Sequence, residues 1–330
     1  MDAKFEISPL LKECNSFEKE LLLEVFQDEY ADGLKTRDLI SHICLRAESL
    51  GVLDDERISS ALARLSSFEK YHRGLIRGFD GERRAYRSVK HAMVEKRILL
   101  NLEIDVDGEH SEFDQLVITP SGLVVIEVKN YSQDAFIDAD GMLRCESNGK
   151  SILYNAGEKM RAKTFAISKA LEEGLGIGRS ECPVFDVLVN ANERSFIRND
   201  FGKIKVCGTG SIPYYIESLG KGDLPLSLMD SIASFLTSIH KPVDIEPPVD
   251  LPATAECLEA AIALMEEAPA IPGDNRARPE QRTEASEHLI RRPANRVHSS
   301  LIAAAAAGAL GFIGGITFAK AATCARGRIK

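Results

Sequence analysis

The sequence predicts a mixed α/β protein with a helical module before its core and a membrane helix after it. Apolar residues recur at helical spacing through residues 1–80, and strand-like apolar runs begin near residue 98. Residues 297–319 form a run without Asp, Glu, Lys or Arg that is long enough to span a bilayer. The chain has 330 residues and is 44% hydrophobic, so it can bury a core, which excludes global disorder.

The helical module, residues 1–80, carries 16 acidic and 11 basic residues. This acidic balance makes a poor DNA-binding surface, so we expect an interaction or regulatory module whose protein partner is unknown. The formal charge of the whole chain is −9, and any nucleic-acid contact must therefore rest on a local basic patch. The seven cysteines form no CxxC motif, so we expect neither a zinc site nor a disulfide framework.

The α/β core is expected over residues 81–240. Pro120-Ser121-Gly122 separates two short apolar runs and therefore predicts a hairpin. The expected elements are a basic helix (81–97), strands (98–104, 116–119 and 123–128), a helix (155–173), strands (183–189 and 204–207) and a helix (226–240). Helix, hairpin, helix and further strands in this order indicate a sheet flanked by helices.

Two acids and a lysine stand at the open end of this hairpin. Side chains alternate between the faces of a strand, so Glu127 and Lys129 point the same way. With a two-residue turn at Pro120-Ser121, Asp114 lies opposite Glu127. A three-residue turn with Gly122 in the left-handed conformation shifts the register by one residue, and the sequence leaves both registers open.

Paired carboxylates repel each other, and a hard divalent cation relieves that repulsion. A nearby lysine then stabilises a metal-activated hydroxide and the charge on a phosphate under attack. The alternative interpretation is a solvent-facing salt bridge among Asp114, Glu127 and Lys129.

The residues of this segment resemble the nuclease-related domain (NERD) family of the PD-(D/E)xK nuclease superfamily. The hairpin matches an acid-apolar-Asp triplet (112–114), an apolar strand, a Gly turn and a second strand that ends Glu127-Val128-Lys129-Asn130-Tyr131. Gly81-Glu82 also precedes Asn101 at the spacing typical of the family. The resemblance covers roughly residues 80–210.

This resemblance implies a restriction-endonuclease-like core and Mg²⁺- or Mn²⁺-dependent hydrolysis of phosphodiester bonds, with DNA as the expected substrate. Asp114 and Glu127 would bind the metal, and Glu82 would complete its ligands from the helix. Lys129 would position or polarise the attacking water. Catalysis would thus rest on Glu82, Asp114, Glu127 and Lys129.

The sequence departs from the family after the hairpin. The family tends to show Asn-Pro and then a Gln on the next helix, whereas this chain has Asn155-Ala156 and Lys159. Lys159 either weakens catalysis or contacts a phosphate together with Lys163. The basic residues Arg83 and Arg87 of the preceding helix are further candidates for nucleic-acid contacts, with a solvated helix face as the alternative.

The C-terminal quarter has a different composition. Eight of the 13 prolines lie in residues 242–293, so residues 241–296 are expected to form a linker with one short helix near 255–267. Residues 297–330 are expected to form a membrane helix and a basic tail. Small residues recur every fourth position (Ala303, Ala307, Gly311, Gly315 and Ala319), a pattern that favours self-association of helices in lipid. A buried Ala-rich helix or a low-complexity tail is the alternative.

These features predict a membrane-associated nuclease whose catalytic domain lies in the cytoplasm, in DNA processing or in defence against foreign DNA. Two other functions remain open at this point. The first is a nucleic-acid-binding module without catalysis. The second is a membrane effector whose small-residue helix oligomerises.

Overall fold

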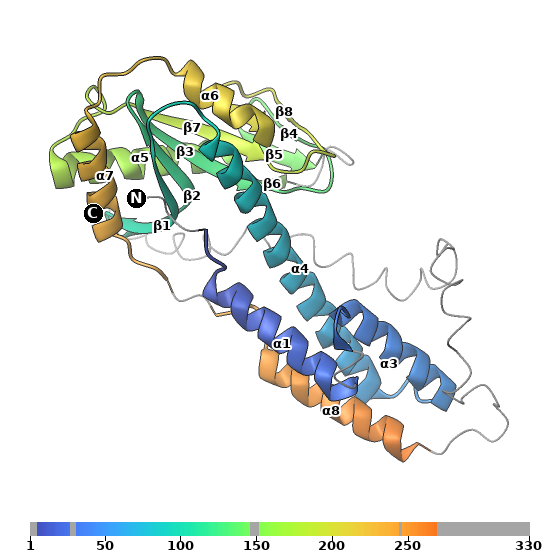
Figure 1. Ribbon diagram of the computed structural model, residues 1–330. Coiled ribbons are helices and arrows are strands. Elements are labelled where there is room, and N and C mark those ends of the chain that lie inside the picture. Colours follow the sequence, from blue (N-terminus) through green and yellow to red (C-terminus); the bar gives the residue numbers. More distant parts are fainter. Residues whose placement is uncertain (1–4, 27–30, 146–151, 244–245, 269–330) are drawn as a thin grey trace, which may run out of the picture.

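The computed structural model describes residues 5–26, 31–145, 152–243 and 246–268. These residues form an α/β part and a layer of helices, and the long helix α4 runs from one to the other (Figure 1). The expected mixed α/β fold is confirmed. The predicted membrane segment, 297–319, lies outside the described residues, and none of the helices that are described is long and apolar enough to cross a bilayer.

The described helices are α1 (Pro9–Val25), α3 (Thr36–Leu50), α4 (Glu56–Lys90), α5 (Ala156–Leu175), η1 (Thr209–Ser211), α6 (Ile212–Ser218), α7 (Leu226–Ser238) and α8 (Leu251–Glu267). The described strands are β1 (Arg97–Val106), β2 (Glu109–Thr119), β3 (Gly122–Lys129), β4 (Ala135–Ile137), β5 (Met142–Cys145), β6 (Ile152–Asn155), β7 (Val184–Asn190), β8 (Ile197–Asn199) and β9 (Lys205–Gly208).

The main sheet has the order β1-β2-β3-β7-β9. Strands β1, β2 and β3 form an antiparallel meander, and β7 and β9 continue the sheet in parallel to β3. Alternate side chains face opposite layers: Leu116 and Val125 pack with α5 and α7, whereas Val117 and Val124 pack with α4 and α6. The sheet is thus buried on both faces, which accounts for its almost wholly apolar central strands.

The hairpin β2–β3 has the two-residue turn of the first predicted register. Thr119 pairs with Gly122, and the Thr119 hydroxyl donates a hydrogen bond to the Gly122 carbonyl oxygen, 3.0 Å away. Gly122 has φ +134°, and a Cβ there would lie 2.3 Å from the Pro183 carbonyl oxygen. Glycine is therefore required by its positive φ and by the close approach of the neighbouring strand.

Helix α4 corrects one expected element. The predicted basic helix 81–97 is the end of a continuous helix that begins at Glu56 and stops at Lys90, and the chain is extended from Arg97. The expected boundary between residues 80 and 81 falls inside this helix. Gly78 and Asp80-Gly81 are capping and turn signals near this point, but the helix continues through them, and Gly81 packs against Asn130 at the end of β3.

Helices α1, α3, α8 and the first half of α4 share one apolar core, which includes Leu39, Leu65 and Leu258. Helix α8 corresponds to the short helix expected near residues 255–267. It packs against α4 in this layer (Figure 1). A second, smaller sheet of the order β6-β5-β4-β8 lies beside the main sheet and was not predicted from the sequence.

A buried polar network joins three helices of the layer. The Glu18 carboxylate accepts hydrogen bonds from the Thr36 amide and hydroxyl, at 3.0 and 2.9 Å. His72 of α4 lies 3.7 Å from Glu18 and makes a 2.8 Å hydrogen bond with Asn15. Burial by itself would raise the pKa of Glu18, but the bonds from His72 and Thr36 lower it from 4.5 to about 2.

We expect Glu18 to stabilise the helical layer above about pH 4.5 and to lose this contribution as the pH falls toward 2, because the folded state holds the carboxylate ionised. Glu18→Gln should lower the free energy of unfolding by about 1–3 kcal/mol at pH 7, and it should flatten its decline below pH 4.5. Urea unfolding followed by circular dichroism at several pH values measures both. The exposed Glu20→Gln on the same helix is the control, and an equal effect of the two variants contradicts the assignment.

Candidate functional site

The two strands of the hairpin bring Asp114 and Glu127 together at its open end. Gln115 pairs with Ile126, so Asp114 comes next in register, opposite Glu127. One Asp114 carboxylate oxygen accepts a 2.6 Å hydrogen bond from the Val128 amide, which fixes this acid at the end of β3. Glu127 lies on the sheet face that α5 covers, because Lys159 and Lys163 of that helix contact its carboxylate. Lys129 lies two residues beyond Glu127, and its ammonium is 2.7 Å from that carboxylate.

Three lysines surround the buried carboxylate of Glu127. Lys159 of α5 is 2.8 Å from the oxygen that Lys129 also contacts, and Lys163, one turn further along α5, contacts the other oxygen. The Glu127 side chain is only 1% exposed, so the solvent-facing salt bridge of the alternative interpretation is wrong. Burial alone would raise the pKa of Glu127, but the charges of Lys129, Lys163 and Lys159 outweigh it and hold the pKa well below its usual value.

Helix α4 adds Glu82 to this group. A Cβ at Gly81 would lie 3.0 Å from the Asn130 Cβ, so the glycine allows the helix to pack closely on the end of β3. The Asn130 side-chain amide donates a hydrogen bond to the Arg77 carbonyl oxygen, and Gln115 donates one to the Glu82 carbonyl oxygen. Gly81 and Asn130 thus have a structural role, because they hold α4 against the end of β3 and so bring Glu82 to the site.

The other three acids, Glu82, Asp114 and Glu112, have raised pKa values because nearby positive charge does not offset their burial and mutual repulsion. Burial, and then the charges of Asp114 and Glu112, raise the pKa of Glu82 to about 8. Burial and the charge of Glu127 raise the pKa of Asp114, and burial and Asp114 raise that of Glu112. We name the four carboxyl groups and three ammonium groups the lysine–carboxylate cluster: Glu82, Glu112, Asp114, Glu127, Lys129, Lys159 and Lys163.

The chemistry of the cluster fits a hard divalent cation, since its donors are carboxylate oxygens that repel one another. Its arrangement is not that of a formed metal site. Across residues 5–26, 31–145, 152–243 and 246–268, no three His, Cys, Asp or Glu side chains lie close enough to hold an ion. Both Glu127 oxygens are engaged by lysines. Glu82, Asp114 and Glu127 lie near one another. Their role as metal ligands remains a prediction.

The four predicted nucleic-acid contacts fall in two places. Lys159 and Lys163 belong to the cluster, whereas Arg83 and Arg87 lie on α4. Arg83 pairs with Asp80 at 2.8 Å and lies over the Phe79 ring. Arg87 is exposed. Arg83 and Arg87 therefore lie on the same helix as Glu82, but they are not members of the charged group around Glu127.

Two members of the site were missed in the sequence. Glu112 enters the sequence analysis only as part of the acid-apolar-Asp triplet, and in the structure the charges of Asp114, Lys163 and Glu127 act on it. The Tyr154 ring lies 5.5 Å from the Lys129 ammonium and 5.6 Å from that of Lys159. The short strand β6 brings this tyrosine to the cluster, and no pattern in the sequence predicts that strand.

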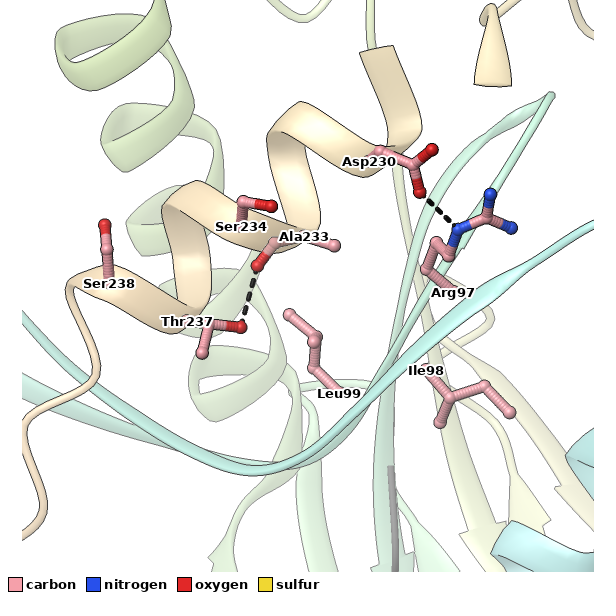
Figure 2. Close-up of a pocket in the computed structure, with 8 residues that line it drawn as sticks. All are labelled: Arg97, Ile98, Leu99, Asp230, Ala233, Ser234, Thr237 and Ser238. Carbon is pink, nitrogen blue, oxygen red and sulfur yellow. Dashed lines mark hydrogen bonds and ion pairs between the residues drawn. The ribbon is translucent and has the colours of Figure 1, made fainter. Parts of the chain in front are cut away.

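A cavity of about 540 Å³ lies between β1 and α7, outside the cluster (Figure 2). The Arg97 side chain pairs with Asp230 at its edge, at 2.6 Å, and Leu99 lines it. The lining part of β1 pairs with residues 116–118, near the hairpin turn, whereas Asp114 lies toward the other end of β2. We assign this cavity no part in the chemistry.

Glu82 should make the folded state less stable as the pH rises. Its raised pKa means that the folded protein keeps a proton that the unfolded chain loses, so stability falls between about pH 4.5 and 8 and then levels off. Glu82→Gln, which is neutral and of equal size, should be more stable than the parent at pH 8 and equally stable at pH 4.5. Urea unfolding in EDTA measures this, with the exposed Glu193→Gln as the control. An unchanged pH profile in Glu82→Gln contradicts the prediction.

Comparison with known protein families agrees with this geometry. Residues 77–190 match the model of the nuclease-related domain (NERD) family. The matched range starts just before Gly81-Glu82, contains every residue of the cluster and ends with β7. No curated protein and no solved structure matches the chain. Residues 77–190, about a third of the chain, therefore form a nuclease-related domain.

Proposed function

We propose that this chain is a Mg²⁺- or Mn²⁺-dependent endonuclease that hydrolyses phosphodiester bonds in DNA, with a core of the PD-(D/E)xK type. The observation that supports it most is the meeting of the buried Glu127 with the half-buried Asp114 and Lys129 at one strand end beside Glu82, within the segment that matches the family. Buried, interacting ionisable groups are costly to fold and are frequent at catalytic sites.

Each residue has a role in this proposal. A cation held by Asp114, Glu127 and Glu82 would act as a Lewis acid and lower the pKa of an attacking water. The Lys129 ammonium would orient that water and offset negative charge on the phosphate as it develops. Lys159 and Lys163 would bind phosphate oxygens, and Arg83 and Arg87 would contact the backbone further along α4.

A second function, nucleic-acid binding without catalysis, has one observation in its favour. Lys159 stands where the family tends to have Gln, and with Lys129 and Lys163 it occupies the carboxylate that would bind the metal. In that case the lysines would bind phosphate, and Glu127 would serve only to hold them in place. Cleavage and metal uptake separate the two functions.

We also propose that a helix over residues 297–319 attaches the chain to the membrane, with the nuclease-related domain in the cytoplasm. Residues 301–319, the apolar part of this run, would span about 28 Å as a helix, close to the thickness of the hydrocarbon core. Its stripe of small residues would allow self-association of copies in lipid. This arrangement suits DNA processing or defence against foreign DNA at the membrane.

Lys129→Met should lower DNA cleavage by a factor of about 10²–10⁴, because it removes the group that orients water. Glu127 keeps Lys159 and Lys163 as partners, so the fold should be retained. The assay follows plasmid, linear and single-stranded DNA, and RNA, with Mg²⁺ or Mn²⁺. Lys169→Met on α5, whose lysine pairs with Asp107 away from the cluster, should leave cleavage unchanged.

If the parent protein and Lys129→Met leave every substrate intact with either metal, the enzymatic proposal fails. Calorimetric Mn²⁺ uptake that disappears in Asp114→Asn would then show a metal-binding site without catalysis. DNA binding without any such uptake would favour the non-catalytic function.

Deleting residues 297–330 should move the protein from the membrane to the soluble fraction of a cell lysate, because the deletion removes the proposed membrane helix. Metal-dependent DNA cleavage by the shortened protein should be unchanged. A full-length chain that remains in the soluble fraction contradicts the membrane proposal and leaves the nuclease proposal intact.

A further inference from the structure

The cluster holds its lysines and its acids in a specific pairing. All three ammonium groups contact Glu127, while Asp114 accepts its hydrogen bond from a backbone amide. Glu127 is thus the most fully paired acid of the cluster, yet it is one of the carboxylates that the proposed metal needs. A cation that binds Glu127 must compete with these ammoniums, which take three of the roughly four lone-pair sites of the carboxylate.

The three lysines differ in how far their side chains are exposed to solvent. The Lys159 side chain is 43% exposed, against 23% for Lys129 and 7% for Lys163. Lys159 is also the first of the two cluster lysines on α5, within a turn of the helix start at Ala156. A ligand that approaches from solvent therefore meets the Lys159 ammonium before it meets Glu127.

The charges of the cluster favour the entry of two ligands together. A divalent cation alone adds two positive charges to a cluster that already holds three ammoniums, and by binding Glu127 it leaves Lys159 beside two other ammoniums without its carboxylate partner. A phosphodiester brings −1 and gives Lys159 a new counterion, so the two ligands together add less net charge than the cation alone to a site where unpaired charge is costly.

We propose that a nucleic-acid phosphate and a divalent cation bind to the cluster cooperatively, because the phosphate draws Lys159 away from Glu127 and so frees a carboxylate oxygen for the cation. The inference rests on the proposed function and concerns how that same site is controlled. Lys159 is then a positioning residue that keeps the metal site closed until nucleic acid is present.

Mn²⁺ binding, measured by the electron paramagnetic resonance signal of the free ion, tests this proposal in the full chain. The probe is a short DNA duplex with phosphorothioate linkages, which resist cleavage. The duplex should raise the affinity of the parent protein for Mn²⁺ by a factor of about 10 or more, a typical coupling between linked sites. By the same linkage, Mn²⁺ should raise the affinity for the duplex by an equal factor.

Lys159→Gln should bind Mn²⁺ without the duplex, and the gain produced by the duplex should shrink to less than about threefold, below the range typical of linked sites. Loss of any nearby positive charge tightens cation binding to some extent, so the ratio of affinities with and without duplex is the deciding measure. Lys169→Gln, on the same helix outside the cluster, should keep the ratio of the parent protein. Titration of the duplex alone corrects for Mn²⁺ that DNA binds by itself.

Equal Mn²⁺ affinity of the parent protein with and without duplex overturns the inference, as does an unchanged ratio in Lys159→Gln. These outcomes are distinct from failure of the proposed function. An enzyme that cleaves DNA but shows no coupling contradicts only the inference, whereas coupling without cleavage on any substrate contradicts only the nuclease.

Discussion

The structure of the nuclease-related domain depends on the burial of one carboxylate, Glu127. Transfer of an ion from water into a protein interior costs several kcal/mol even after relaxation, and only partners at short distance offset that cost. Three ammonium groups offset this cost at Glu127, and two of them come from α5. The requirement fixes the face that α5 turns toward the sheet and its position along β3. Apolar packing around Met160 and Ile167 stabilises this placement without specifying it.

A second constraint acts from the opposite layer. Helix α4 reaches the end of β3 only because Gly81 has no side chain, and bonds from Asn130 and Gln115 hold it there. The close approach puts Glu82 near Asp114, where burial and like charge keep it short of a partner. The two helices thus impose opposite electrostatics on one strand end, with excess positive charge at Glu127 and excess negative charge at Glu82 and Asp114.

The sequence predicted the parts of this site that depend on local patterns. The hairpin, the alternation that places Asp114, Glu127 and Lys129 on one face, and helix α5 all follow from spacing and turn chemistry. The β1–β2 hairpin was missed although Asp107-Gly108, both at positive φ, is a strong turn signal. The second sheet was missed for a different reason: strands of three or four residues carry no periodicity, so their pairing is a tertiary effect that no local pattern encodes.

The helical layer and the site share one element, since α4 contributes to the core around Leu65 at one end and carries Glu82 toward the other. Between these ends a side chain at Gly74 would meet no neighbouring atom, whereas His72 is buried and Leu75 packs against the helical core, so one side of the helix is held along this stretch as well. Intact α-helical hydrogen bonding transmits a rotation or shift along the axis with little loss. The network of Glu18, Thr36 and His72, which fixes how α1 and α3 sit on α4, therefore also restrains the position from which Glu82 approaches Asp114.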